Sequence, residues 1–216
     1  MTSSLAQPIS ETLAAGVQFK VLAHVFPVLR HEVIAPVSNA GLAVAMLRHG
    51  MHGTDSHQEG LINELESMLL ESTAEVRRLG DWLEGTGATL PLDHLLELCR
   101  KLLFGHLLRA ARQIDLPESC PVLDLPEFGS RYVLLAWFLS LLDHLPHDDV
   151  LHIEMGGERH LVARPSTPRG FAVPPATPGR IAMDEVQCLA EHHGWQCRFD
   201  DQSWSLKLPS GTVLPG

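Results

Sequence analysis

The sequence predicts an α+β fold, in which an N-terminal antiparallel helical hairpin is followed by a small α/β sandwich. Three observations predict it. Two long segments repeat apolar residues every three or four positions, the spacing of amphipathic helices. The pattern changes to alternating short helices and strands after Gly85–Thr86–Gly87. Gly156–Gly157 lies between two strand-like runs, which is a hairpin signal. The expected parts are a tail over 1–16, a hairpin over 17–86 and an α/β domain over 87–216.

The hairpin follows from two apolar stripes joined by a short polar turn. The first stripe is Leu22, Phe26, Leu29, Val33, Ala40, Ala43 and Leu47, with Pro27 and Pro36 inside the same helix. The second, expected over about 59–84, is Leu61, Leu65, Met68, Val76, Leu79 and Leu83. Two helices alone cannot enclose a core, so the stripes predict a homodimer whose hairpins form a four-helix bundle.

The α/β part is expected as follows. Helices are predicted over 92–112, 127–145 and 183–193, and strands over 113–116, 150–155, 159–163, 196–199 and 203–208. The helix over 127–145 is so apolar that most of its faces should be buried. The stretch 165–178 is rich in proline and glycine and reads as a loop.

Composition excludes some functions. The 216 residues carry 16 Lys and Arg against 26 Asp and Glu, a net charge of −10, which does not suit a nucleic-acid binder. No apolar stretch approaches the roughly 18 or more residues of a membrane span, so no membrane partner is expected. The N-terminus lacks the features of a secretory signal, and the four cysteines show no CxxC spacing, so we expect a cytoplasmic protein with reduced thiols.

The most informative local pattern is the run Arg30-His31-Glu32 followed by Pro36. His31 lies two residues from both Leu29 and Val33, off the apolar stripe, and should therefore face solvent. A neutral imidazole is a nucleophile near neutral pH, and Glu32 could orient it through a hydrogen bond. The alternative is a solvated surface histidine, since the chain has 13.

The pattern H-E-x-x-x-P on the first helix of a hairpin resembles the H-box of sensor histidine kinases. Residues 120–124, the apolar helix and residues 150–155 resemble the opening of the kinase ATPase domain, and residues 189–194 and 206–209 its closing helix and strand. The whole resembles the stand-alone histidine phosphotransferases of the ChpT type. This resemblance implies that His31 relays a phosphoryl group between the aspartates of receiver domains. Glu32 would assist, and Arg30 would stabilise phosphoryl charge.

The sequence departs from an ATP-dependent kinase. Its two asparagines, Asn39 and Asn63, both lie in the hairpin, so none can hold Mg²⁺ and nucleotide on the apolar helix. No D-x-G-x-G motif occurs, and the proline-rich stretch 165–178 stands where the resemblance places the ATP lid. We therefore expect a degenerate ATPase-like domain without a cofactor, with Mg²⁺ supplied by the receiver domain. The response-regulator receiver is the expected partner.

Other interpretations stay open. The same dimer could be a non-catalytic adaptor that binds or sequesters a response regulator. His49, His52, Asp55 and His57 could bind a metal or form a polar turn. His144 and His147 are expected at the surface, and His192 and His193 at a helix C-terminus, where positive charge is favourable. Cys188 and Cys197 are expected as free thiols, and the stripe from Tyr132 to Phe138 as core.

Overall fold

The computed structural model describes residues 6–48, 55–168, 170–172, 179–200 and 202–210. Its elements, in chain order, are α1 (Ala6–Arg48), α2 (Asp55–Gly80), β1 (Thr89–Pro91), α3 (Leu92–Arg109), β2 (Gln113–Asp115), β3 (Asp124–Pro126), α4 (Glu127–His144), β4 (Val150–Met155), β5 (His160–Pro165), α5 (Met183–His192), β6 (Gln196–Phe199) and β7 (Trp204–Lys207). The fold class predicted from the sequence is confirmed: two long helices precede a small α/β region with a mixed sheet.

The chain forms two compact units. The first joins residues up to His24 with residues from Gly87 onward, and the second comprises residues 25–86. The expected boundary at residue 17 and the expected tail over 1–16 differ from this division. Helix α1 already begins at Ala6, and its first half belongs to the α/β unit. The reason is a stripe of buried residues, Ala14, Val17 and Val21, which places this segment in the core of that unit.

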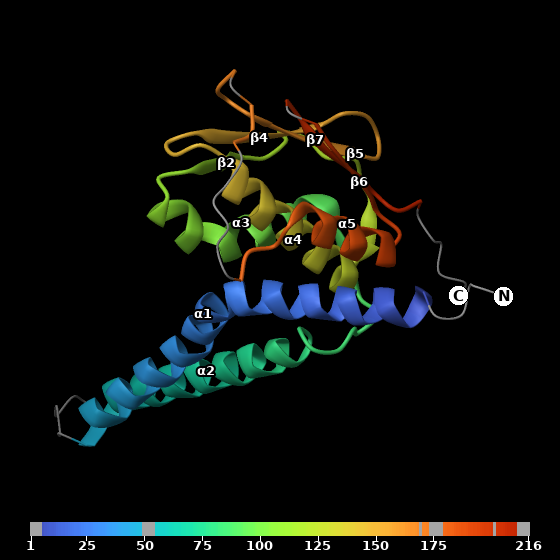
Figure 1. The fold of residues 1–216 in the computed structure, drawn as a ribbon. Coiled ribbons are helices and arrows are strands. Elements are labelled where there is room, and N and C mark those ends of the chain that lie inside the picture. Colours follow the sequence, from blue (N-terminus) through green and yellow to red (C-terminus); the bar gives the residue numbers. More distant parts are fainter. Residues whose placement is uncertain (1–5, 49–54, 169, 173–178, 201, 211–216) are drawn as a thin grey trace. The chain divides into compact units, whose positions relative to one another are not determined.

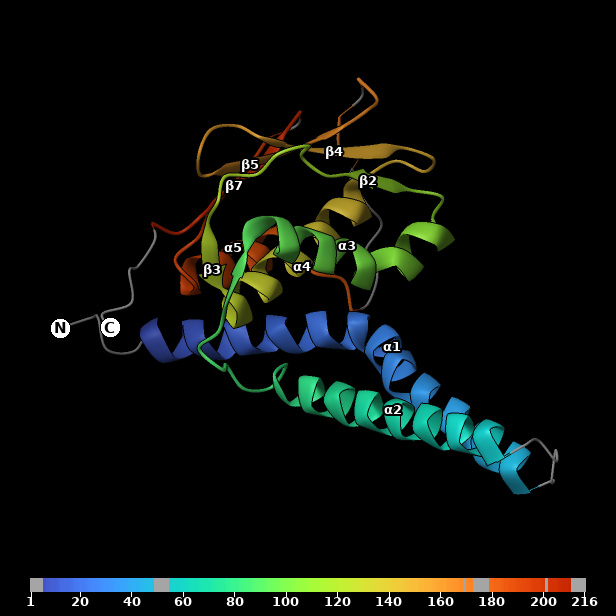
Figure 2. The same ribbon diagram turned by 180° about the vertical axis from the view of Figure 1, so that it is seen from behind.

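The α/β unit is layered (Figure 1). Its five strands are ordered β2-β4-β5-β7-β6, with β2 and β4 parallel and every other pair antiparallel. Helices α3, α4 and α5 cover one face of this sheet, and residues 6–24 of α1 lie beyond them (Figures 1 and 2). A separate pair, β1 and β3, joins the segments that lead into α3 and α4.

Helix α4 forms the centre of this unit. Its residues from Gly129 to Leu142 are all buried, as its apolar sequence predicts. Tyr132, Trp137 and Phe138 are among them, which confirms their interpretation as core. Burying each such large side chain is worth about 1.5–3 kcal/mol, so α4 is the main source of hydrophobic stability.

Several boundaries differ from the expected ones for local reasons. Helix α3 ends at Arg109 rather than 112, because Ala111 adopts a left-handed conformation with φ 48°. The strands β1 and β3 were not expected, since each has three residues and ends in proline, too short for an alternating pattern.

The hairpin unit contains residues 25–48 of α1 and helix α2, which run antiparallel side by side (Figures 1 and 2). Leu29, Ala40 and Ala43 of the predicted first stripe are buried. Both helices also leave apolar side chains in solvent. These are Phe26, Ile34, Val37 and Leu42 on α1, and Ile62, Leu69, Leu70 and Val76 on α2.

One expectation on hydropathy is wrong. The stretch Ser10–Ala45 of α1 has the length and the mean hydropathy, 1.4, that a membrane-crossing helix needs. The sequence-based expectation missed this stretch, because scattered polar residues divide its apolar residues. A core helix of a soluble protein passes the same test of length and hydropathy. In this chain, Ala14, Val17 and Val21 of the stretch are buried in the core of the α/β unit.

Candidate functional site

His31 lies in the part of α1 that belongs to the hairpin unit, and it is exposed. The buried residues Leu29 and Ala40 mark the inner side of this helical segment. At about 100° per residue, His31 lies nearly opposite them. The sequence-based expectation that its ring faces solvent agrees with this placement, so the imidazole is open to another molecule.

The neighbours of His31 are arranged by helix geometry. Arg30 is exposed and Glu32 is half-buried. Adjacent side chains on a helix diverge by about 100°, so these two residues flank His31 and do not stack on its face. Ile34 and Ala35, one turn later, do share that face. Orientation of the His31 ring by Glu32 stays a prediction.

Pro36 lies inside the helix, five residues after His31. A proline at this position lacks the amide hydrogen that a regular helix directs at the carbonyl group of residue 32. Helix α1 nevertheless continues to Arg48. The backbone next to His31 is therefore built with one helical hydrogen bond fewer than usual.

The site is a convex helix surface. Phe26, Ile34, Val37 and Leu42 expose between 48% and 63% of their surface on the same helical segment. His31 does not line the cavity at His24 and His106 or the one at Arg100 and Phe104. A reaction at an exposed imidazole would need another molecule to bring the reacting group and exclude water.

The C-terminal end of α4 packs against aromatic and polar side chains from later in the chain. The ring of Trp204 packs at 4.7 Å from His144 and at 4.9 Å from Phe171. Arg180 donates a hydrogen bond from Nη2 to Nε2 of His144, at 2.9 Å. Asn39 and Asn63 both lie in the hairpin helices, as expected. Helix α4 therefore carries no asparagine that could help to hold Mg²⁺ and nucleotide.

Two expectations about histidines are wrong. His144 is buried rather than at the surface, because Arg180 and Trp204 cover it; its Nδ1 donates to the carbonyl oxygen of Ser140 at 2.7 Å. His193, at the end of α5, does not favour positive charge. Burial, with a smaller contribution from His192, lowers its pKa to about 4. His147 is exposed, as expected.

The structure tests the prediction for the cysteines but not the one for the histidine-rich turn. The four cysteines are free, which agrees with the prediction for Cys188 and Cys197. His49 and His52 lie outside the described residues, as do the side chains of Asp55 and His57, so the metal interpretation of this turn is untested. Within the described ranges, no group of three His, Cys, Asp or Glu residues is arranged to hold a metal ion.

Sequence reasoning missed the polar contacts that fix the first half of α1. Gln18 lies 3.1 Å from Nε2 of His193, and Nε2 of His24 donates to the carbonyl oxygen of Gly179 at 3.0 Å. Nε2 of His106 donates to the carbonyl oxygen of His24 at 3.3 Å. These partners lie more than 80 residues apart in the chain, and no local pattern could have paired them.

Comparison with known proteins finds likeness in three-dimensional structure alone. No family model matches the chain, and no curated protein matches it. The solved structures that it resembles include histidine kinases and a phosphotransferase. The cytoplasmic segment of histidine kinase QseC is 14% identical with a TM-score of 0.43, over 57% of this chain and 78% of that one.

Two further structures match more of the chain. The histidine kinase AdeS of Acinetobacter baumannii is 14% identical with a TM-score of 0.45, over 83% of this chain and 97% of that one. A bacterial phosphotransferase is 13% identical with a TM-score of 0.40, over 87% of this chain and 95% of that one. Likeness at this level assigns neither a family nor an activity.

Proposed function

We propose that the protein is a histidine phosphotransferase, which relays a phosphoryl group between the aspartates of receiver domains through His31 and does not bind ATP. The observation that carries the proposal is the exposed position of His31 within the sequence H-E-x-x-x-P, on the outer side of a helical hairpin. The resemblance of this sequence to the H-box of histidine kinases supplies the reaction class.

The reaction consists of two displacements at phosphorus. A ring nitrogen of His31 attacks the phosphorus of a phosphoaspartate, the P–O bond to aspartate breaks, and the donor keeps its carboxylate. In the second step an aspartate oxygen of another receiver attacks the same phosphorus, and the P–N bond breaks. The proton on the other ring nitrogen stays in place throughout, so neither step consumes or releases a further group.

The residues beside His31 have distinct proposed roles. Glu32 accepts a hydrogen bond from the protonated ring nitrogen and so keeps the opposite nitrogen available for attack. Arg30 offers a positive charge to the transferring phosphoryl group. The receiver supplies Mg²⁺ and the walls of the site, which fits the convex surface around His31. Receivers as partners also imply a cytoplasmic location.

A homodimer is part of the proposal. Ile62, Leu69 and Val76 follow one another at seven-residue spacing along α2, and each exposes about half of its surface. Such a heptad seam packs against other helices. Pairing two hairpins into a four-helix bundle would remove this seam and Phe26 from water.

Transfer from phosphorylated receivers tests the proposal. The chain is incubated with a panel of radiolabelled phospho-receivers, and acid-labile label on it is followed with time. The wild-type chain and a His94→Ala control, which removes an exposed histidine of α3, should take up label, whereas His31→Ala should not. Uptake by His31→Ala at the wild-type rate would overturn the assignment. If neither chain is labelled but both bind one receiver tightly, the protein is an adaptor.

The absence of ATP binding is tested separately. Calorimetry with ATP and Mg²⁺ should give no more heat than inorganic triphosphate with Mg²⁺, because α4 carries no asparagine that could help to hold Mg²⁺ and nucleotide. Binding of ATP that triphosphate does not reproduce would show a nucleotide site and contradict this part of the proposal.

A further inference from the structure

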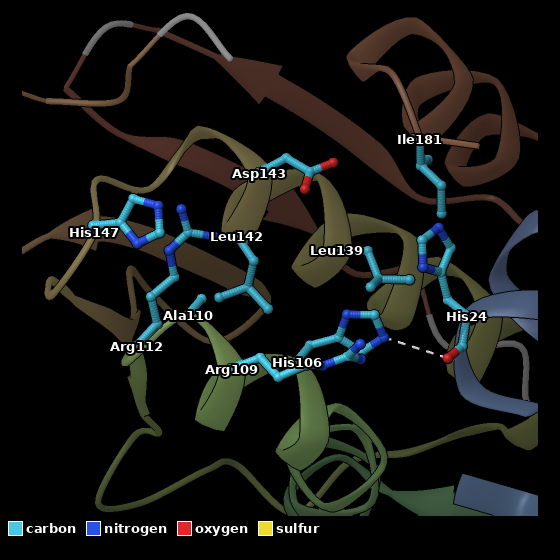
Figure 3. A pocket seen from close by; sticks show the side chains of 10 residues that line it. All are labelled: His24, His106, Arg109, Ala110, Arg112, Leu139, Leu142, Asp143, His147 and Ile181. Carbon is cyan, nitrogen blue, oxygen red and sulfur yellow. Dashed lines mark hydrogen bonds between the residues drawn. The ribbon is translucent and has the colours of Figure 1, made fainter. Parts of the chain in front are cut away.

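A cavity of about 300 Å³ lies within the α/β unit, where the C-terminal ends of α3 and α4 meet residue 24 of α1 (Figure 3). The polar residues that line it are His24, His106, Arg109, Arg112, Asp143 and His147. Leucine, alanine and isoleucine side chains complete its wall. None of these residues takes part in the proposed phosphotransfer.

The lining is rich in positive charge. Two arginines, Arg109 and Arg112, face one carboxylate, that of Asp143, whose Oδ2 is already 3.2 Å from Nε of Arg180. The chain as a whole has a net charge of −10, so this local excess runs against its composition. An anion entering the cavity would therefore find uncompensated cations around it.

The two arginines are held by backbone carbonyl groups. Arg112 donates from Nη2 to the oxygen of Leu145 at 2.6 Å and from Nε to that of Pro146 at 3.3 Å. Arg109 donates from Nε to the oxygen of Gly105 at 3.0 Å. In the described part of the chain, neither forms an ion pair with a carboxylate. Carbonyl anchors position a guanidinium without neutralising it.

The positive charge of the cavity comes from its arginines rather than from His106. Burial lowers the pKa of His106, and the nearby charges of His24 and Arg109 lower it further, while the backbone hydrogen bond and Asp143 act in the opposite sense. Burial also lowers the pKa of Arg112. The rings of His24 and His106 lie 5.5 Å apart and both line the cavity.

Backbone strain is concentrated around the same cavity. In the described chain, the non-glycine residues with positive φ are Ala111, at 48°, and Asp148, at 59°. Ala111 directly precedes the lining residue Arg112, and Asp148 directly follows His147. Left-handed backbone is unfavourable at ordinary residues, and such positions cluster at functional sites.

We propose that this cavity binds a phosphate-type dianion carried by a small molecule. Guanidinium groups match the oxygens of a phosphate in geometry and charge. Since one water molecule takes about 30 Å³ of liquid, the volume exceeds what inorganic phosphate needs, and it lies at the lower end of small-molecule sites. A small phosphomonoester fits both the charge and the size.

Isothermal titration calorimetry of the 216-residue chain measures the binding of glycerol 3-phosphate and of inorganic phosphate. Sodium chloride at matched ionic strength is the blank. Glycerol 3-phosphate should bind more tightly than inorganic phosphate if the ester part occupies the cavity. Equal affinities would assign the site to free phosphate and overturn the phosphomonoester. Heat no greater than that of chloride would overturn the site itself.

Matched variants locate the binding. Arg109→Gln should weaken binding of glycerol 3-phosphate about tenfold, the usual effect of losing one charge-assisted hydrogen bond. Arg100→Gln makes the same change of charge on α3 at an exposed position that does not line this cavity, and it should leave the affinity within about twofold. Thermal melting confirms that both variants fold. Equal losses in both variants would show nonspecific attraction and contradict the proposal.

Sulfate adds a test through pH, because its charge is constant between pH 6 and pH 8. A bound dianion favours the protonated form of His106, whose other charged neighbours are His24, Arg109 and Asp143, so sulfate should bind more tightly at pH 6. An affinity for sulfate that does not change over this range would place the anion away from His106 and overturn the assignment of the cavity.

Discussion

Lys20 of α1 and Glu185 of α5 form an ion pair across 165 residues of sequence, with 2.6 Å between Nζ and Oε1. Lys20 also donates to the carbonyl oxygen of Arg180 at 3.3 Å. The other carboxylate oxygen of Glu185 accepts from the backbone amide of Ala182 at 3.0 Å, at the start of α5. One carboxylate thus caps a helix and holds the first half of α1 to it.

Glu185→Gln should lower the free energy of unfolding by about 0.5–1 kcal/mol, because the pair is partly exposed and its charge term is screened. Glu185→Ala should cost about 1–2 kcal/mol, since the cap is lost as well. Urea denaturation measures both. A double-mutant cycle with Lys20→Met isolates the pair, and a coupling energy of zero would mean that the ion pair contributes nothing to stability.

Glu32→Gln should slow transfer from a phospho-receiver by about 10²-fold without abolishing it, because the acceptor ring stays while its proposed orienting carboxylate is lost. Rapid-quench kinetics with the labelled receiver gives the rate. His24→Ala is the control, since His24 belongs to the α/β unit and bonds Gly179, and its transfer rate should stay near that of the wild type. A Glu32→Gln rate equal to that of the control would remove Glu32 from the reaction.

Leu69→Glu and Phe26→Glu should each convert a dimer into a monomer, because both side chains expose about half of their surface in the single chain. Burial of one large apolar side chain contributes about 1.5–3 kcal/mol. Placing a charge in the seam of a four-helix bundle costs more than this contribution. Sedimentation should give about twice the 23.8 kDa chain mass for the wild type. Leu108→Glu, exposed on α3, should leave the dimer intact. A wild-type monomer at high concentration contradicts the bundle.

Gly129→Ala should destabilise the protein by about 1–3 kcal/mol, the cost of overpacking a core. A Cβ at residue 129 would lie 2.5 Å from Nδ1 of His193, so the ring must move and disturb its contact with Gln18. Gly16→Ala, on exposed α1 with nothing within 4 Å, should instead stabilise by about 0.5–1 kcal/mol. Calorimetric melting compares the two, and equal melting temperatures would refute the steric argument.

Acid should destabilise the α/β unit through His193. Its pKa is about 4 in the folded state, against about 6.5 in the unfolded chain. Between these two pKa values, His193 binds a proton in the unfolded chain but not in the folded chain. The stability is fully present above pH 6.5 and is lost as the pH falls from there toward 4. His106 and His144, whose pKa values are also lowered, act in the same direction.

Urea denaturation at pH 7.5, 6 and 5 measures this dependence. His193→Gln should flatten the curve over this range, because its side chain takes up no proton in either state. A slope identical to that of the wild type would mean that the acid sensitivity arises elsewhere.

Local sequence patterns were enough to predict the helices and strands whose bounds depend on neighbouring residues. The apolar run of α4 and the strands β4 and β6 were predicted within one residue of their bounds. The stripe of α1 was recognised only in part: Leu29, Ala40 and Ala43 are buried, whereas Phe26 is 48% exposed, and the division of the helix between two units was not predicted. Val17, Val21, Val25 and Leu29 follow one another every fourth residue, so periodicity gives no sign that the packing partner changes after His24.

The misjudged side chains depend on distant residues. His144 reads as a surface residue beside Pro146, yet it is buried because Arg180 and Trp204 return to cover it. The cavity lining comes from α1, α3, α4 and the turns beside them, and its residues look like ordinary polar positions in sequence. His31 was proposed from a local signal: a position off the apolar stripe, beside an acid and before a proline.

The division of α1 between two compact units bears on how this architecture can be rearranged. A fragment that begins at Gly87 lacks Ala14, Val17 and Val21, and with them a layer of the α/β core. A fragment restricted to residues 25–86 begins in mid-helix, without a capped start. Neither unit can therefore be exchanged between proteins as a contiguous cassette. Recombination that respects this fold must carry the N-terminal helix, and hence His31, together with the C-terminal domain.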